Sequence, residues 1–198
     1  MIPERSIFTI GHSTHAFEAF AALLARHGVT AVADVRSHPY SRLAHFHRPA
    51  LEARLPAAGV QYVFLGRELG ARRDEPECYV DGQADYRRIA ALPAFAAGLE
   101  RLERGARTHR IALMCAEKEP LDCHRTILVS RQLALRGWNV RHILADGSLE
   151  TQADCDRRLL RLTGVARTLF DAGLDDARLI ERAYDVRAAQ IGYRVPAV

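Results

Sequence analysis

The sequence predicts an α/β fold: a mainly parallel sheet with helices on both faces, forming a Rossmann-like three-layer sandwich, followed by C-terminal helices. Short apolar runs alternate with helix-like stretches, a pattern typical of βαβ units and a parallel sheet. Glycines end several of these stretches, as Gly28 does after Leu23–His27, because glycine readily adopts the left-handed conformation past a helix end. The chain of 198 residues can bury a sizeable core, but a second independent domain would be cramped.

Five apolar runs are the expected strands, each short and rich in Val, Ile, Leu, Phe and Tyr. Right-handed crossovers between such strands would place helices on both faces of the sheet. From about residue 149 the chain is predicted to form helices, Thr151–Leu162 and roughly Asp175–Ala189, that pack on the sheet. We therefore expect a single domain over residues 1–198, with a core over about 6–148 and a helical appendix over about 149–198. The expected strands are Ser6–Ile10, Ala31–Val35, Gln61–Leu65, Ile111–Cys115 and Val140–Leu144.

Composition narrows the class of protein. No apolar run approaches the roughly 20 residues of a membrane helix, and the start of the chain does not resemble a signal peptide, so a cytoplasmic location without membrane contact is expected. The net charge of +4 permits an anionic partner without requiring one. The four cysteines match neither C-x-x-C nor zinc-finger spacing, and we expect free thiols.

Polar, chemically capable residues follow every expected strand. In a parallel sheet the loops after the strands emerge at one edge, where ligands bind in open α/β folds. Five stretches that are distant in sequence are therefore expected to converge on one site. They are Gly11–His15, Asp34–Pro39, Leu65–Gly70, Cys115–Arg125 and Ala145–Ser148.

The fourth of these loops is the richest in reactive groups. Asp122 is expected to cap a helix that begins at Cys123, so that free backbone amides and Arg125 offer a site for a phosphate or carboxylate. Alternatively, Arg125 only pairs with a nearby acid such as Asp34. Glu117 is either a general acid or base or a charge that orients an arginine.

The two cysteines of this loop have different expected roles. Cys115 lies at a strand end and is expected to be a buried structural thiol. Cys123, at the predicted helix start, is the more reactive candidate because a helix N-terminus favours the thiolate. Cys115 and Arg125 are ten residues apart, which differs from the compact C-x5-R loop of cysteine phosphatases.

The first two loops add further candidates. His12 can transfer a proton near neutral pH or tie loops together through hydrogen bonds. Asp34 and Arg36 lie two residues apart and share one side of an extended strand, so they either pair with each other or leave Arg36 to face a ligand.

Two longer loops are open to more than one interpretation. Phe46, among basic residues, either stacks on a base or anchors its loop in the core. The neighbouring His38, His45 and His47 lack a matching carboxylate spacing, and no metal site is assigned to them. The segment Arg67–Asp85 is long and polar, and is either a lid or binding loop, to which Arg72, Arg73 and Tyr79 would contribute, or a solvated connection.

The motifs together resemble the uncharacterised DUF488 family. The resemblance spans roughly residues 8–147, and its most specific part runs from Leu113-Met114-Cys115-Ala116-Glu117-Lys118 to Cys123-His124-Arg125. It implies an α/β fold and supports a convergent site, but it implies no reaction. The chain departs from the family pattern at Arg67 and His47. The other matching pieces are Ile10-Gly11-His12-Ser13, Asp34-Val35-Arg36-Ser37 with Pro39 and Ser41-Arg42, Tyr62 with Leu65-Gly66, Val140-Arg141-His142-Ile143, and the tail pieces Ala183-Tyr184 and Ile191-Gly192-Tyr193.

The sequence favours an enzyme of hydrolase or transferase type that binds an anionic substrate, either a nucleotide or a component of a nucleic acid. A dinucleotide site is not expected, since no G-x-G-x-x-G follows the first strand, and the cofactor and oligomeric state are left open. The alternatives are a non-catalytic nucleic-acid or nucleotide binder, and a metal or redox site built from the paired cysteines and the neighbouring histidine. The expected catalytic residues are Glu117, His12 and Asp34, and the expected substrate-binding residues are Arg36, Ser37, Arg42, Cys115, Cys123, His124 and Arg125.

Overall fold

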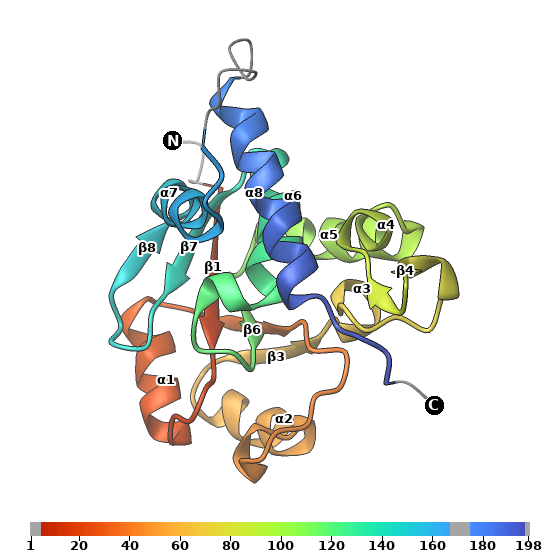
Figure 1. Cartoon of the computed structure of the whole chain (residues 1–198). Helices are drawn as coiled ribbons and strands as arrows, with labels where there is room; N and C mark the ends of the chain where they lie inside the picture. Colours follow the sequence, from red (N-terminus) through yellow and green to blue (C-terminus); the bar gives the residue numbers. More distant parts are fainter. Residues whose placement is uncertain (1–4, 167–174, 197–198) are drawn as a thin grey trace.

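A six-stranded sheet with the order β3-β2-β6-β1-β7-β8 forms the centre of the computed structural model (Figure 1). The structure describes residues 5–166 and 175–196. The first five strands in this order are mutually parallel, and β8 pairs antiparallel with β7. The predicted α/β fold with a mainly parallel sheet is confirmed. The strands are β1 (Ser6–Gly11), β2 (Ala31–Asp34), β3 (Gln61–Phe64), β6 (Ile111–Cys115), β7 (Asn139–Ile143) and β8 (Leu149–Thr151).

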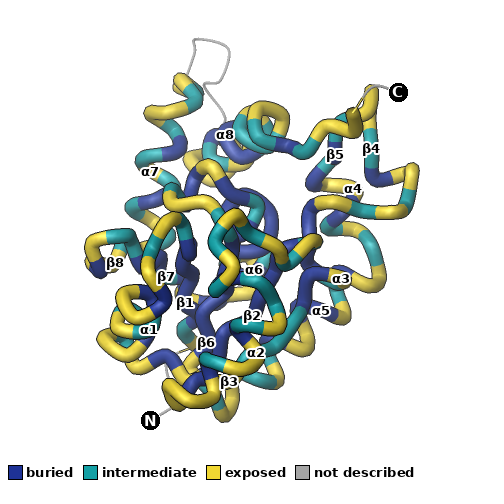
Figure 2. Tube along the Cα trace, turned by 90° about the horizontal axis from the view of Figure 1, so that it is seen from below, coloured by how far each residue is buried: buried dark blue, intermediate teal, exposed yellow. Residues whose placement is uncertain are grey.

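Helices cover both faces of this sheet, as the sequence predicted. In Figure 1, α1 (Phe17–Arg26) and α2 (Arg48–Ala57) lie below the strands and the remaining longer helices lie above them. Alternate strand residues bury into two separate clusters: Phe8 and Ile10 pack with α1 and α2, whereas Ile7 packs toward the other face. The neighbouring strands β2, β6 and β1 are buried along nearly their whole length (Figure 2). The helices of the second face are α5 (Pro93–Gly105), α6 (Arg131–Leu135), α7 (Gln152–Thr163) and α8 (Asp176–Ile191).

The direction of the chain across the sheet reverses between β2 and β6. The chain runs from β1 through β2 to β3, and then returns through β6 to β7 and β8. β2 and β6 are neighbours, but their outgoing connections lead to opposite faces of the sheet. Such a reversal leaves a crevice at the carboxyl ends of the two strands, the usual ligand position in open α/β sheets.

Small elements fill the segment predicted as the long polar loop Arg67–Asp85. It follows the start of α3 (Gly66–Leu69) and contains the hairpin β4 (Tyr79–Val80) and β5 (Gln83–Ala84). Asp85 caps α4 (Tyr86–Ala90). The C-terminal segment runs beside this hairpin, because the Ala84 amide donates to the Tyr193 carbonyl at 2.8 Å.

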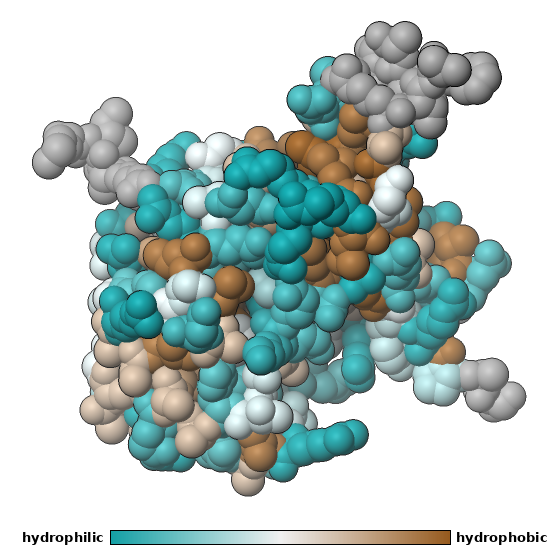
Figure 3. All heavy atoms as spheres, turned by 60° about the vertical axis from the view of Figure 1, so that its left-hand side comes forward, coloured by the Kyte–Doolittle hydropathy of each residue, from teal (hydrophilic) through white to brown (hydrophobic). Residues whose placement is uncertain are grey.

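Hydrophilic side chains predominate on the face shown in Figure 3, and apolar ones gather in a few places. Large exposed apolar side chains are few among the described residues, with Tyr40 and Leu135 each 73% exposed. No helix within residues 5–166 or 175–196 has the length and apolar character needed to cross a membrane.

A fully buried histidine predicts a pH dependence of stability. His142 of β7 is 0% exposed, and its Nδ1 lies 2.9 Å from the Thr9 hydroxyl. Burial and the nearby charge of Arg125 lower the pKa of His142 to about 3. The unfolded chain therefore binds a proton at this residue near pH 6.5 while the folded chain does not, so the stability from neutral His142 is present above that pH and is lost as the pH falls.

We expect His142 to account for about 2 kcal/mol of the loss in unfolding free energy between pH 7 and pH 5. Urea unfolding of the parent and of His142→Leu at both pH values measures this. Between pH 7 and pH 5, the unfolding free energy of the variant should fall by about 2 kcal/mol less than that of the parent, because the other titrating groups are common to both proteins. Equal losses would show that His142 stays accessible to protons in the folded state.

Candidate functional site

A pocket of about 470 Å³ opens at the crevice between the carboxyl ends of β2 and β6. The loops after these two strands supply one wall, and the segment after α3 with the C-terminal residues supplies the other. Of the five stretches expected to converge on one site, two line this pocket, Asp34–Pro39 after β2 and Cys115–Arg125 after β6. Gly11–His15, Leu65–Gly70 and Ala145–Ser148 contribute no residue to its lining. The pocket is lined by Arg36, Ser37, His38, Tyr40, Ala71, Arg72, Tyr86, Cys115, Ala116, Glu117, Asp122, Cys123, His124, Ile191 and Tyr193.

Two thiols and a carboxylate meet at the floor of the pocket. The sulfurs of Cys115 and Cys123 lie 3.1 and 3.0 Å from the same oxygen, Oε2 of Glu117. Both cysteines are buried, whereas Glu117 as a whole is exposed to solvent. The carboxylate therefore connects the buried thiols with the open pocket.

His124 completes this cluster in a defined orientation. Its Nε2 lies 2.9 Å from the Val35 carbonyl oxygen, which can only accept, so Nε2 carries a hydrogen. Nδ1 then faces the sulfurs, 3.6 Å from Cys115 and 3.9 Å from Cys123. These sulfur and nitrogen atoms all lie within 4.8 Å of one another, so the three side chains could hold a metal ion.

The four groups perturb one another's ionisation. Burial, together with the hydrogen bond to Cys123, raises the pKa of Cys115 well above its ordinary value. Burial opposes ionisation of Cys123 too, but the hydrogen bond from Cys115 and the charge of Arg125 hold its pKa well below the ordinary value. Partial burial of its carboxylate and the negative Cys123 raise the pKa of Glu117. Burial disfavours the imidazolium, yet contact with Cys123 raises the pKa of His124.

The sequence predicted that a helix begins at Cys123 with Asp122 as its cap, and this prediction is wrong. Pro120–Asp122 form a turn of 3₁₀ helix whose first amide bonds to the Glu119 carboxylate at 3.1 Å. Cys123 is extended, and a π-helix begins only at Arg125 (Arg125–Ser130). Asp122 instead pairs with Arg187 of α8. A competing cap at Glu119, with Pro120 at the first position of the turn, explains the difference.

Arg125 supports this loop from beneath. The side chain is 0% exposed, and its Nη1 and Nη2 donate to the carbonyls of Glu117 and Lys118 at 2.6 and 3.2 Å. Arg125 does not line the pocket. The arginine expected to bind an anion thus lies among backbone acceptors, and its contacts set the position of the Glu117 backbone.

A second buried network positions Arg36 at the pocket wall. Its Nε and Nη2 donate to the two oxygens of Asp34 at 2.9 and 2.6 Å, and Tyr62 donates to the same carboxylate at 2.8 Å. Of the two arrangements left open by the sequence, Asp34 and Arg36 adopt the pair, although Arg36 still lines the pocket. His12 lies behind Arg36, with its Nε2 accepting from Arg36 Nη1 at 3.3 Å.

His12 is neutral and faces the interior. Its Nδ1 donates to the Ser13 carbonyl at 3.0 Å, and its ring stacks on Phe46 at a centroid distance of 4.2 Å. Burial and the charge of Arg36 lower the pKa of His12 to about 4. Phe46 is fully buried and anchors its loop in the core, one of the two roles considered for it.

The remaining predicted residues divide between pocket and surface. Ser37 lines the pocket, and its hydroxyl accepts from the Arg72 amide at 2.9 Å, which fixes the segment after α3. Arg42 is exposed and lies outside the pocket lining. His45 and His47 bond to backbone carbonyls at 3.0 and 2.7 Å, consistent with a role in shaping their loop.

Nine of the pocket residues were not among the predicted site residues, and three of these nine are distant in sequence from the strand ends of the central sheet. Tyr86 begins α4, and Ile191 and Tyr193 lie at and beyond the end of α8. Arg72, considered only as part of a lid, lies over the Tyr193 ring at 4.5 Å. The sequence signals for this wall were the long polar segment Arg67–Asp85 and the tail motif Ile191-Gly192-Tyr193.

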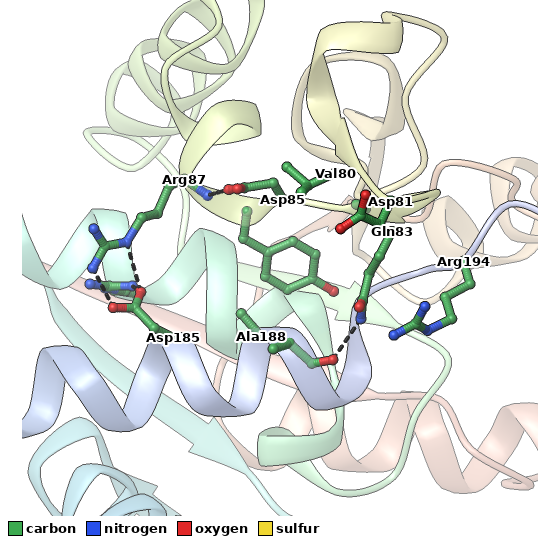
Figure 4. A pocket seen from close by; sticks show the side chains of 12 residues that line it. Val80, Asp81, Gln83, Asp85, Arg87, Asp185, Ala188 and Arg194 are labelled. Atoms are coloured by element: carbon green, nitrogen blue, oxygen red, sulfur yellow. Dashed lines mark hydrogen bonds and ion pairs between the residues drawn. The ribbon is translucent and has the colours of Figure 1, made fainter.

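A second pocket, of about 460 Å³, lies between the hairpin β4–β5, α4 and α8 (Figure 4). Arg87 and Arg131 both pair there with Asp185. Figure 4 shows Arg194 at the opposite end from Arg87, and Gln83 bonded to the backbone of α8. Because its central charges pair with each other, this pocket is less suited to chemistry than the first.

The fold and the site define a three-layer α/β protein with paired thiols, a histidine and a carboxylate in a pocket at the carboxyl edge of its sheet. The chain belongs to the DUF488 family, a domain of unknown function whose profile matches residues 16–132. The resemblance seen in the sequence is thereby confirmed. No curated protein and no solved structure matches the chain.

Proposed function

We propose that this protein is an enzyme of hydrolase or transferase type that acts on a small anionic substrate with a planar ring, a nucleotide or a component of a nucleic acid. The observation that carries the proposal is the position of Glu117, which is open to the pocket while its Oε2 touches two buried thiols. Enzyme sites characteristically combine an accessible pocket with titratable groups whose pKa values are perturbed by burial and charge.

The walls of the pocket support the choice of substrate class. Tyr40, Tyr86 and Tyr193 supply aromatic surface suited to a planar heterocycle. Arg72 is exposed at the rim, and a guanidinium there can form charge-assisted hydrogen bonds with a phosphate or carboxylate. In this arrangement Arg72 takes the anion-binding role that the sequence gave to Arg42 and Arg125.

Glu117 is the proposed proton-transferring group. A raised carboxyl pKa brings an acid or base closer to neutral pH, where it can both give and accept a proton. Asp34 and His12 act on Arg36 rather than on the substrate, because neither lines the pocket. They are therefore proposed as positioning residues. Hydrolysis or group transfer at a glycosidic or phosphate linkage is compatible with these groups.

Ligand binding and turnover test the proposal together. Calorimetry with nucleoside monophosphates, nucleoside diphosphates and short oligonucleotides should find a ligand whose affinity falls about tenfold to a hundredfold in Arg72→Ala, the loss of a charged hydrogen bond. Arg42→Ala is the matched control, since Arg42 is exposed outside the pocket, and it should bind as the parent does.

Glu117→Gln distinguishes an enzyme from a binder. The variant should retain affinity for the ligand found with the parent but lose most of the turnover, measured as release of base or phosphate. Binding without any turnover in the parent would favour the non-catalytic alternative. Loss of affinity in Arg42→Ala but not in Arg72→Ala would place the anion elsewhere.

A further inference from the structure

The sulfurs and nitrogen at the pocket floor have the spacing of ligands around one metal ion. Zinc bonds of about 2.3 Å to sulfur and 2.1 Å to nitrogen, at tetrahedral angles, place the two ligand atoms roughly 3.6 Å apart. His124 Nδ1 lies 3.6 Å from the Cys115 sulfur and 3.9 Å from the Cys123 sulfur. Little movement of these side chains would be needed to surround a zinc ion.

The surroundings of His124 hold its ring in the orientation of a ligand. The Val35 carbonyl accepts the hydrogen on Nε2 at 2.9 Å, so the lone pair of the neutral ring is on Nδ1, which faces the sulfurs. Histidine ligands of metals commonly donate their other ring hydrogen to a carbonyl or carboxylate in this way, which fixes the tautomer.

The backbone also holds the two cysteines in place. Cys115 ends the central strand β6, and its carbonyl accepts from the His12 amide at 2.9 Å. The Cys123 sulfur accepts from the Arg125 amide at 3.4 Å, as sulfur ligands of metals often do from nearby N–H groups. Both cysteines are buried, so the cluster forms with the fold rather than by the meeting of mobile surface groups.

A metal ion held by these three side chains would have a fourth coordination position, which would face the pocket. The protein supplies two sulfurs and one nitrogen, and Glu117 is the fourth polar group beside them. Glu117 is exposed and lines the pocket, and its Oε2 lies 3.1 and 3.0 Å from the two sulfurs. The side of the cluster that Glu117 covers is therefore the side that faces the pocket, where a fourth coordination position would be open to water or substrate.

We propose that Cys115, Cys123 and His124 bind one zinc ion whose fourth coordination position opens into the pocket beside Glu117. Zinc accepts thiolate and imidazole ligands in the same site. Three protein ligands with one exchangeable position are typical of catalytic rather than structural zinc. The inference does not depend on the substrate class proposed above, because the ligand atoms alone define the site.

Metal content and affinity of the full chain, purified without a histidine tag, test the proposal. Elemental analysis should find about one zinc per chain, and after chelation calorimetry should show rebinding of one equivalent. Cys123→Ser and His124→Gln should each weaken zinc binding at least a hundredfold. Cys155→Ser is the matched control, because Cys155 is an equally buried thiol in α7 outside the cluster, and it should bind zinc as the parent does.

Cobalt(II) gives a reading that does not depend on the folding of a variant. The reloaded parent should show a sulfur-to-cobalt charge-transfer band and the strong visible bands of tetrahedral coordination. A parent that binds neither zinc nor cobalt, or octahedral cobalt bands without the charge-transfer band, would overturn the proposal. Arg72→Ala separates the two proposals, because this variant should bind zinc as the parent does but bind the nucleotide more weakly. If the parent binds no nucleotide at all, the proposed function fails and the zinc result still stands.

Discussion

Asp34→Asn is expected to lower the free energy of unfolding by about 3–5 kcal/mol, the usual cost of removing one partner of a buried ion pair. Asp34 is 0% exposed and Arg36 only 4% exposed. The carboxylate accepts from Arg36 Nε and Nη2 and from the Tyr62 hydroxyl at 2.6–2.9 Å. Asparagine has nearly the same shape, so the cost comes from leaving the buried guanidinium without a counter-charge.

Chemical denaturation of the parent and the variant measures this difference. Glu52→Gln is the control, since the Glu52–Arg48 pair has a similar separation of 2.7 Å but both side chains are more than 40% exposed. The unfolding free energy of Glu52→Gln should be lower than that of the parent by less than about 1 kcal/mol. Adding Arg36→Gln to Asp34→Asn should recover part of the stability, because the unpaired charge is then gone. Equal losses for the buried and exposed pairs would mean that burial of the guanidinium carries no penalty here.

Much of the fold could be predicted because the strands of a parallel sheet are continuous apolar runs. Ile111–Cys115 was predicted with its observed bounds, three other predicted strands differ by one residue at one end, and Val140–Leu144 is shifted by one residue from the observed Asn139–Ile143. The strand β8 was missed because its three residues Leu149–Thr151 have no such run, and they form a strand only by pairing with β7. The same holds for the two-residue strands β4 and β5.

The location of the candidate site followed from the sequence, but side-chain directions did not. Parallel strands place the loops after β2 and β6 at the same edge of the sheet, and the strand order, which the sequence analysis did not predict, makes these two strands neighbours. Whether Arg125 faces the pocket or the carbonyls beneath it depends on the extended Cys123 and the π-helix after it, which no local pattern specified. Tyr193 reaches the pocket through pairing of the C-terminal segment with β5, a contact over more than 100 residues.

The loop after β6 is held from two sides, and this links the fold to the chemistry of the site. Arg125 bonds to the carbonyls of Glu117 and Lys118. The Ser13 amide extends the pairing of β1 with β6 by donating to the Ala116 carbonyl at 2.9 Å. The backbone at Glu117 is therefore fixed at the point where its side chain meets the two cysteines. A change that moves this backbone should alter stability and the metal site together.

Gly11→Ala is the change expected to do so. A Cβ at Gly11 would lie 1.9 Å from the Glu117 carbonyl oxygen and 3.2 Å from Arg125 Nη1. The first contact is with backbone that Arg125 already holds at 2.6 Å, so no side-chain rotation relieves it. We expect a loss of about 3 kcal/mol or more in unfolding free energy, and zinc affinity in the folded variant should fall at least tenfold as the loop shifts.

Gly105→Ala is the matched control for this prediction. A Cβ at Gly105 would meet only the end of the Ile111 side chain, at 3.1 Å, and alanine is favoured over glycine in a helix such as α5. Its unfolding free energy should change by less than about 1 kcal/mol, with zinc affinity unchanged. If Gly11→Ala changed the unfolding free energy and the zinc affinity as little as Gly105→Ala, the backbone around Glu117 would have to move freely. The thiols and His124 would then lack the fixed carboxylate neighbour on which the proposed enzyme depends.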